Sequence, residues 1–362
     1  MKQNIGIVGA GLAGRLLALE CLQRGWHVTL FDSGNSSGQQ SCGWVAAGMI
    51  APYSELESSE PLLFHLGRES LQQWPIILKY LPLPVAFNAA GTVIVAHPQD
   101  IGHITRFKQV IHHKLADMFP QVSQEHAIKK LSPKELDHFV PGISPIINEG
   151  YWIAEEGQIS STDFFKASSA ALQSSDVVWH ENTRVNGINP FKITTEQNTY
   201  HFDLVCDCRG LGAKQDWSNL RGIRGEIIWL ETSEVKMDCS VRLMHPRHPI
   251  YISPRPNHLF VVGATSIESE DRSPITVLSM MELLSVAYTL HPGFAEAKIV
   301  NMLTQCRPTL KNHSPKITYQ DGLLGINGLY RHGYLAGPTV IQEALRLVEH
   351  GKAALKYPEL FD

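Results

Sequence analysis

The sequence lacks the features that mark several classes of protein. No uninterrupted apolar run reaches the roughly 18 residues of a membrane-spanning helix, so we expect no membrane span. Positive charge is not in excess, because 31 Lys and Arg stand against 35 Asp and Glu, with a formal net charge of −4. This balance provides no basic footprint for nucleic acid or for an anionic membrane surface, so we expect neither as a partner.

Cysteine is scarce and is not arranged for metal binding. The chain has six cysteines, and Cys206-x-Cys208 lacks a second pair at zinc-ribbon spacing. Seventeen histidines occur without HExxH or a comparable ligand spacing. We therefore expect no metal site and free thiols in a reducing compartment. The N-terminal residues run straight into a strand pattern without a signal-peptide h-region, which favours the cytoplasm.

A nucleotide-binding pattern stands near the N-terminus. An apolar strand at 5–8 leads into Gly9-x-Gly11-x-x-Gly14, and a helix pattern and a second strand ending at Asp32 follow. Gly9 permits a tight turn, Gly11 lets the backbone approach a pyrophosphate, and Gly14 allows close packing of helix on strand. The helix N-terminus suits the phosphates, and Asp32 suits the ribose hydroxyls. This unit predicts a dinucleotide site without choosing between FAD and NAD.

Three later stretches bear on the cofactor. Small residues are so dense at 41–52 that something bulky should lie against the backbone, although a tight helix start in the core is the alternative. An apolar strand at 204–206 precedes a glycine-bearing turn and suggests another strand of the same sheet. The third stretch, 329–338, precedes a helix pattern in which Pro338 suits the first helical position. The strands of this nucleotide-binding domain are thus spread over most of the chain, whereas most NAD dehydrogenases have a compact nucleotide-binding domain.

On these stretches the chain resembles a known family. It is similar to the amino-acid oxidase group of FAD oxidoreductases (the D-amino-acid oxidase and glycine oxidase family), and within that group to the glycine oxidases of bacterial thiamine biosynthesis. The resemblance covers nearly the whole chain. Its carriers are 9–14 (GAGLAG), 42–52 (CGWVAAGMIAP), 207–214 (DCRGLGAK), 220–226 (LRGIRGE), 245–255 (HPRHPIYISPR), 261–269 (VVGATSIES), 306–308 (CRP) and 329–338 (LYRHGYLAGP).

The expected fold is α/β (α+β overall), with a Rossmann-like FAD-binding domain and an interleaved antiparallel-sheet substrate domain. Strand-like runs at 91–96 and 258–263 are bounded by Gly, Pro and Asn, and helix patterns cover 100–118 and 279–290. We expect 1–80, 146–220 and 301–362 to form the discontinuous FAD-binding domain. The substrate-binding domain would then comprise 81–145 and 221–300.

The resemblance implies non-covalent FAD. Related sarcosine oxidases attach flavin through a cysteine in this region, but Cys306 stands one residue out of step, and we expect a core thiol there. Val185 would meet the adenine through its backbone, with ordinary core packing as the alternative. The residues assigned to FAD in this way are Gly9, Gly11, Leu12, Ala13, Gly14, Asp32, Ser33, Cys42, Gly43, Ala47, Gly48, Met49, Val185, Leu329, Tyr330, Arg331, His332, Gly333, Tyr334 and Leu335.

Three residues are implied on the substrate side. Arg307 follows an alternating apolar–polar run and precedes a proline, so it should stand at a strand end. In the family the matching arginine grips the substrate carboxylate, for which a planar guanidinium is suited. Arg331 matches a second arginine beside substrate and flavin, and Tyr251 matches a tyrosine of the substrate pocket. The alternatives are an ion pair with Asp or Glu for either arginine, and core packing for Tyr251.

The implied reaction is the two-electron oxidation of glycine, with molecular oxygen as acceptor. Hydride would leave the α-carbon for flavin N5, the imine would hydrolyse to glyoxylate and ammonia or be passed on for thiazole synthesis, and reduced flavin would give hydrogen peroxide. Ser266 replaces the methionine of most relatives, which leaves the substrate open. Two alternatives stay open: an oxidase or quinone-linked dehydrogenase of sarcosine, proline or small D-amino acids, and a flavin-binding partner or maturation protein without turnover. A homo-oligomer is also left open.

Overall fold

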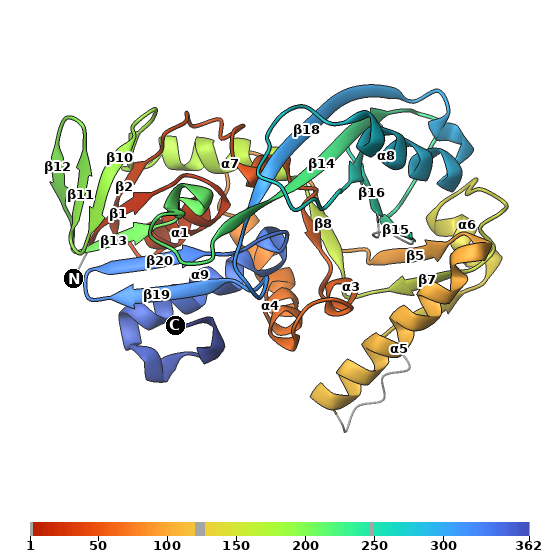
Figure 1. Cartoon of the computed structure of the whole chain (residues 1–362), viewed down its shortest axis with the longest axis horizontal. Helices are drawn as coiled ribbons and strands as arrows, with labels where there is room; N and C mark the ends of the chain where they lie inside the picture. The colour runs from red at the N-terminus through yellow and green to blue at the C-terminus, as the bar shows by residue number, and fades with distance from the viewer. Residues whose placement is uncertain (1–2, 120–126, 246–249, 362) are drawn as a thin grey trace.

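The structure, a computed structural model, describes residues 3–119, 127–245 and 250–361 (Figure 1). Its two large sheets are each built from strands that lie far apart in the sequence. Residues 246–249 of the 245–255 motif lie outside the described residues. The six cysteines are free thiols.

The first large sheet has six strands in the order β19-β20-β13-β1-β2-β9. All neighbours pair in parallel except β19 with β20. The parallel pairing of β13 with β1 confirms that the segment around Leu204–Cys206 returns to the first sheet. The strands are β1 (Asn4–Val8), β2 (His27–Phe31), β9 (Val178–His180), β13 (Leu204–Asp207), β19 (Lys316–Gln320) and β20 (Leu323–Asn327).

Four long helices pack around this sheet in one hydrophobic core. Ile5 and Ile7 of β1 are both fully buried, as expected for a parallel strand that is covered on its two faces. The carboxyl ends of β1, β13 and β20 meet at one edge, the usual place for a ligand in such sheets. The helices are α1 (Leu12–Gln23), α4 (Pro61–Leu78), α7 (Ser161–Gln173) and α9 (Gly333–His350).

The second large sheet has eight strands in the order β18-β14-β17-β16-β15-β5-β7-β6. Its pairs are antiparallel except β5 with β15. The two predicted helical segments are the helices α5 (Ile101–Met118) and α8 (Val277–Leu290). A third, shorter helix is α6 (Pro133–Phe139). The strands are β5 (Thr92–Ala96), β6 (Lys129–Leu131), β7 (Gly150–Ile153), β14 (Arg221–Glu231), β15 (Ser240–Met244), β16 (Ile250–Arg255), β17 (Leu259–Gly263) and β18 (Lys298–Thr309).

Shorter elements complete the chain. Two three-stranded sheets have the orders β3-β8-β4 and β10-β11-β12. The strands are β3 (Met49–Ile50), β4 (Phe87–Asn88), β8 (Gly157–Ile159), β10 (Val185–Asn189), β11 (Lys192–Thr195) and β12 (Thr199–His201); the helices are α2 (Cys42–Val45), α3 (Pro52–Leu56), and the 3-10 turns η1 (Pro98–Asp100), η2 (Gly210–Ala213), η3 (Pro292–Phe294), η4 (Lys352–Ala354) and η5 (Pro358–Leu360).

The long strands β14 and β18 pair along their whole length and arch from the six-stranded sheet to the body of the eight-stranded one (Figure 1). Two strands of the larger sheet, β7 and most of β18, fall within the ranges 146–220 and 301–362 that we assigned to the FAD-binding domain. The division of the chain into two domains remains a prediction.

One helix start differs from the prediction. Helix α9 begins at Gly333, so Pro338 lies inside the helix rather than at its first position. A proline there lacks the N–H that would bond to the carbonyl of Tyr334. That carbonyl instead accepts a hydrogen bond of 2.8 Å from Trp74 Nε1, which satisfies the freed group and lets the helix run through the proline.

None of the helices in the described ranges combines the length and the hydropathy that crossing a bilayer requires. Across the same residues, no group of three or more His, Cys, Asp or Glu side chains could hold a metal ion.

Candidate active site

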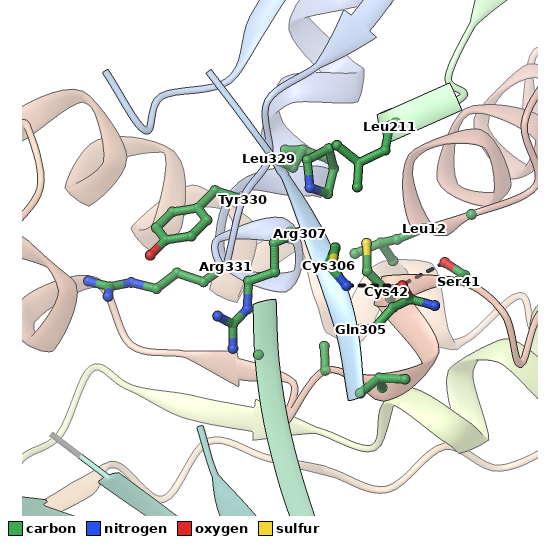
Figure 2. A pocket seen from close by; sticks show the side chains of 18 of the residues that line it. Leu12, Ser41, Cys42, Leu211, Gln305, Cys306, Arg307, Leu329, Tyr330 and Arg331 are labelled. Atoms are coloured by element: carbon green, nitrogen blue, oxygen red, sulfur yellow. Dashed lines mark hydrogen bonds between the residues drawn. The ribbon is translucent and has the colours of Figure 1, made fainter. Parts of the chain in front are cut away.

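A cavity of about 460 Å³ is lined by residues of both large sheets. Its walls include the turn after β1, the loop after β2, helix α2 and the residues that follow it, the middle of β14, the end of β18, and the segment before α9 (Figure 2). The fold therefore brings residues of three motifs from different parts of the chain, 9–14, 42–49 and 329–334, to one cavity.

The glycine-rich turn is shaped so that only glycine fits at two positions. Gly9 has a φ of +100°, and a Cβ there would lie 2.6 Å from the carbonyl oxygen of Cys208. A Cβ at Gly14 would lie 1.8 Å from the oxygen of Gly9. The N-cap of α1 has no side-chain cap, so the first N–H groups of the helix remain available to an anion.

Asp32 supports this turn directly. One carboxylate oxygen accepts from the N–H of Ala10 at 2.5 Å, and the other accepts from the N–H of Gly34 at 2.7 Å. The carboxylate that was predicted to face a ribose therefore also connects the turn to the loop after β2. Asp32 and Ser33 both line the cavity.

The small-residue stretch combines the two interpretations that the sequence left open. Residues Cys42–Val45 form a short helix, whereas Ala47, Gly48 and Met49 line the cavity. Gly48 has a φ of +69°, and a Cβ there would lie 2.0 Å from the oxygen of Ile159. The backbone is thus held close to β8 with no side chain between them. Arg255 Nη2 donates to the oxygen of Ala47 at 2.5 Å and fixes the stretch from behind.

Arg307 presents a cation with no acidic partner. Its Nη1 donates to the oxygen of Thr265 at 3.0 Å, and within the described part of the chain no carboxylate makes an ion pair with it. Burial lowers the pKa of its guanidinium from the usual value. Gly225 makes room for this group, because a Cβ there would lie 2.1 Å from Arg307 Nη2. The ion pair that was the alternative for Arg307 is therefore not made by the described residues.

Arg331 differs from Arg307, and the two side chains point in different directions (Figure 2). Its Nε lies 2.8 Å from Glu55 Oε2, and its Nη2 donates to Ser58 Oγ at 2.8 Å. Glu55 Oε2 also lies 3.0 Å from His332 Nε2. Burial alone would raise the pKa of Glu55, but Arg331 and His332 outweigh it and hold that pKa below its usual range. Arg331 therefore forms the ion pair that was considered as its alternative.

Tyr251 and Ser266 form another part of the wall. Tyr251 is 8% exposed, and its buried hydroxyl makes no hydrogen bond within the described residues. The guanidinium of Arg242 lies 5.7 Å from the centre of its ring and is itself held by Glu57 at 2.6 Å. Ser266 Oγ lies 3.0 Å from the hydroxyl of Tyr330. The serine that replaces the usual methionine is thus tied to a predicted cofactor residue.

The structure brings most of the predicted site residues to the cavity. Four do not line it: Gly14 packs on Gly9, His332 bonds to Glu55, Leu335 packs toward Gly67, and Val185 packs beside a small cluster that includes Ile193. Core packing was the alternative for Val185. The predicted residues that line the cavity are Gly9, Gly11, Leu12, Ala13, Asp32, Ser33, Cys42, Gly43, Ala47, Gly48, Met49, Tyr251, Arg307, Leu329, Tyr330, Arg331, Gly333 and Tyr334.

Sequence reasoning missed Glu55 and Arg255. Glu55 lies just beyond the small-residue stretch, but nothing local to it indicates a partner 276 residues away. Arg255 ends the YISPR segment that carried part of the resemblance, and its position there was the available signal. The cavity also involves Thr265, whose carbonyl oxygen holds Arg307.

These features fit a bound FAD. The uncapped start of α1 and the glycine turn suit a pyrophosphate, and the bare backbone at Gly48 suits a flat ring system. Arg307, which has no acidic partner among the described residues, adds positive charge to the same cavity. The fold and the cavity together indicate an enzyme that depends on a nucleotide cofactor.

Residues 4–344 match the model of the DAO family, FAD dependent oxidoreductase, and the chain belongs to this family. It is 35% identical to the "Putative thiamine biosynthesis oxidoreductase ThiO" of Rhizobium etli, over 96% of this chain and 98% of that protein. It is 23% identical to the "Glycine oxidase" of Geobacillus kaustophilus, over 98% and 94% of the two chains.

Solved structures agree on the fold. The crystal structure of glycine oxidase from Geobacillus kaustophilus superposes with a TM-score of 0.83 at 22% identity, covering 99% of this chain and 98% of the other. The reduced L-alpha-glycerophosphate oxidase from Mycoplasma pneumoniae, with FAD bound, superposes with a TM-score of 0.76. The family, the fold class and the FAD-dependent class of enzyme expected from the sequence are confirmed.

Proposed function

We propose that this enzyme is a glycine oxidase that uses non-covalently bound FAD and molecular oxygen in the cytoplasm and supplies the thiazole branch of thiamine biosynthesis. The observation that carries the proposal is Arg307, whose guanidinium has no acidic partner among the residues that the structure describes and lies in the same cavity as the glycine-rich turn. The names of the Rhizobium etli and Geobacillus kaustophilus relatives support the substrate and the pathway.

Arg307 would bind the substrate carboxylate. Its Nη1 already donates to Thr265, and this hydrogen bond fixes the plane of the guanidinium while leaving its other N–H groups for two carboxylate oxygens. Tyr251 has a buried hydroxyl that makes no hydrogen bond to any described residue, and it would donate to the same carboxylate. A neutral small side chain on the substrate suits the site, because Arg331 is engaged by Glu55.

FAD would lie along the predicted residues that line the cavity. The turn at Gly9–Ala13 would hold the pyrophosphate, Asp32 the ribose, and Ala47–Met49 the flavin ring, with the start of α9 near its pyrimidine side. When bound, FAD supplies two-electron oxidation, with flavin N5 as the hydride acceptor. Cys306 lines the cavity, and its thiol lies 3.8 Å from the oxygen of Ser269 and 3.7 Å from that of Asp271, so a sulfur that donates to these backbone oxygens would leave the flavin non-covalently bound.

No side-chain base would need to remove the α-proton. The carboxylates among the residues that line the cavity are Asp32 and Glu55. Asp32 is engaged by the turn, and Glu55 is held ionised between Arg331 and His332. This arrangement favours a substrate amine that binds in its neutral form and loses hydride, so that the protein contributes position and charge.

Anaerobic reduction tests the proposal. The purified enzyme is mixed with glycine, sarcosine, D-alanine or D-proline without oxygen, and the flavin absorbance is recorded. Bleaching fastest with glycine, followed by peroxide formation when air is admitted, supports a glycine oxidase. Bleaching by the other amino acids alone would show an oxidase of a different small amine. No bleaching would favour a flavin-binding partner without turnover.

The role in thiamine synthesis has its own test. The chain is expressed in a bacterium that needs added thiamine because its own glycine oxidase gene is deleted. Growth without thiamine supports the proposal, and an Arg307→Ala variant serves as the inactive control. If the purified enzyme oxidises glycine but the bacterium does not grow, the proposed reaction stands and the proposed role in thiamine synthesis is wrong.

A further inference from the structure

Arg15 directly follows the last glycine of the nucleotide motif and lies in the second turn of α1. Its side chain is 0% exposed, and the neighbouring residues of α1, from Leu12 to Ala18, are buried as well. The mechanism proposed above does not use it, and it does not line the cavity. A fully buried arginine needs an explanation, because such groups are costly to bury without partners.

The guanidinium of Arg15 links two segments that border the cavity. Its Nε donates to the oxygen of Ala10, in the middle of the glycine-rich turn, at 2.8 Å. Its Nη2 donates to the oxygen of Ser36, in the loop after β2, at 2.7 Å. Residues on both sides of Ser36, including Ser33 and Gly38, line the cavity. One side chain therefore sets the spacing between the turn and the loop.

Helix α7 anchors the same group from behind. Arg15 Nη1 donates to the oxygen of Phe165 at 3.1 Å, to Ser168 Oγ at 3.2 Å and to Ser169 Oγ at 2.7 Å. The ring of Phe165 stacks below it, with the guanidinium carbon 4.4 Å from the ring centre. Ser169 Oγ also donates to the oxygen of Ser36 at 2.5 Å. The loop position is therefore determined by Arg15 and Ser169 together.

The charge of Arg15 is not cancelled by a direct ion pair with any described residue. The acidic groups that influence it are Asp32 and Glu181, and neither is among its hydrogen-bond partners. Burial lowers the pKa of the guanidinium to about 10, so it remains protonated at neutral pH. A buried cation of this kind is best compensated by an anion that binds nearby. The glycine turn, where a pyrophosphate fits, is one hydrogen bond away.

We propose that Arg15 is a positioning residue for FAD, which holds the glycine-rich turn and the loop after β2 at the spacing that the adenosine and pyrophosphate half of the cofactor requires. This inference rests on the FAD site proposed above. It predicts that the loss of Arg15 weakens binding of the ADP half by the protein that still folds, because the turn and the loop after β2 lose the side chain that links them.

The test compares Arg15→Met and Arg15→Lys in the apoprotein. Methionine keeps much of the apolar part of the side chain but removes the charge and the N–H donors. Lysine keeps the charge but loses the planar set of guanidinium donors. Affinity for ADP and for FAD is measured by calorimetry, and the unfolding temperature of each apoprotein by circular dichroism. Arg24→Met is the matched control, because Arg24 is on the same helix and its charge pairs at the surface with Glu20 and Glu349.

We expect Arg15→Met to weaken ADP and FAD binding by about 30-fold, the loss that follows if the displaced turn fails to make one hydrogen bond to the charged pyrophosphate. Arg15→Lys should fall between it and the wild type, and Arg24→Met should bind as the wild type does. A purely structural role would lower the unfolding temperature of the apoprotein while the remaining folded protein binds ADP normally. ADP affinity within threefold of wild type in Arg15→Met overturns the inference.

The experiment remains decisive if a variant does not fold or if the wild-type protein does not bind the nucleotides. If Arg15→Met does not fold, Arg15→Lys and Ser169→Ala replace it, and unchanged ADP affinity in both overturns the inference. If the wild-type protein binds neither ADP nor FAD, the FAD site itself is wrong, and the inference falls with it. Normal FAD binding by the wild type without glycine oxidation would refute only the substrate, and the Arg15 comparison would still stand.

Discussion

Arg307 offers the sharpest test of how this cavity recognises its substrate. The guanidinium is without an acidic partner among the described residues, is oriented by Thr265 and stands over Gly225. Replacing it with alanine removes the group proposed to bind the substrate carboxylate. It leaves the glycine-rich turn and the residues proposed to hold FAD in place, so the flavin should remain bound.

The expected loss of substrate affinity follows from the hydrogen bonds that Arg307→Ala removes. Two charge-assisted hydrogen bonds contribute about 1.5–3 kcal/mol each, and each 1.4 kcal/mol corresponds to about a factor of ten in affinity. Arg307 is only half buried, and solvent reduces the contribution. We therefore expect Arg307→Ala to weaken substrate binding at the lower end of the resulting range, by about 100-fold.

Acetate is a suitable probe because it has the carboxylate and cannot be oxidised. Its dissociation constant is measured from the shift that it causes in the flavin absorbance, and that of glycine from anaerobic reduction. Arg307→Lys should lie between alanine and the wild type, since an ammonium keeps the charge without the planar fork. Arg272→Ala is the matched control, because Arg272 also lines the cavity but is exposed. Acetate and glycine affinities within threefold of wild type in Arg307→Ala would refute the assignment.

The remaining predictions concern space and charge near the cavity. Gly225→Ala should weaken acetate binding as Arg307→Ala does, because a Cβ 2.1 Å from the guanidinium displaces it; unchanged affinity would contradict the geometry. Gly48→Ala should lower the free energy of unfolding, measured by urea denaturation, by about 1–3 kcal/mol and reduce the flavin content, because φ is +69° at this position. An unchanged free energy of unfolding would contradict this prediction. Glu156 is fully buried beside Ser54, and burial raises its pKa to about 7. The folded state therefore holds a proton that the unfolded state releases above about pH 4.3, so this group's stabilisation is present in acid and is lost as the pH rises to 7. Glu156→Gln should remove about 3 kcal/mol of that pH dependence; an unchanged profile would disprove it.

Much of the site could be predicted because its motifs are local. The turn at Gly9–Gly14 depends on a strand, a tight turn and a helix that follow one another directly, and the structure has all three. The segment before α9 was also predicted to lie at the site, and residues 329–331 line the cavity. The start of α9 was wrong because the group that compensates for Pro338 is Trp74, which the local sequence does not reveal.

The two arginines of the predicted site show more clearly what the local sequence cannot predict. Arg307 stands between a cysteine and a proline, Arg331 between a tyrosine and a histidine, and both were expected to face the substrate. Only the fold brings Glu55 and Ser58 to Arg331 and leaves Arg307 with a carbonyl oxygen. The partners of Arg331 are 276 and 273 residues away and the partner of Arg307 is 42 residues away, which spacing within a motif cannot report.

The amino-acid sequence by itself determined the family, the dinucleotide-binding unit and the segments that surround the cofactor, because glycine spacing and strand patterns act over a few residues. The tertiary structure decided which charges are paired. It pairs Arg331 with Glu55, gives Arg307 no acidic partner in the part of the chain that is described, and buries Arg15 between the glycine turn, the loop after β2 and helix α7. The physical reason is that a charge is paired or free according to what lies within a few ångströms of it, and here those neighbours come from distant parts of the chain.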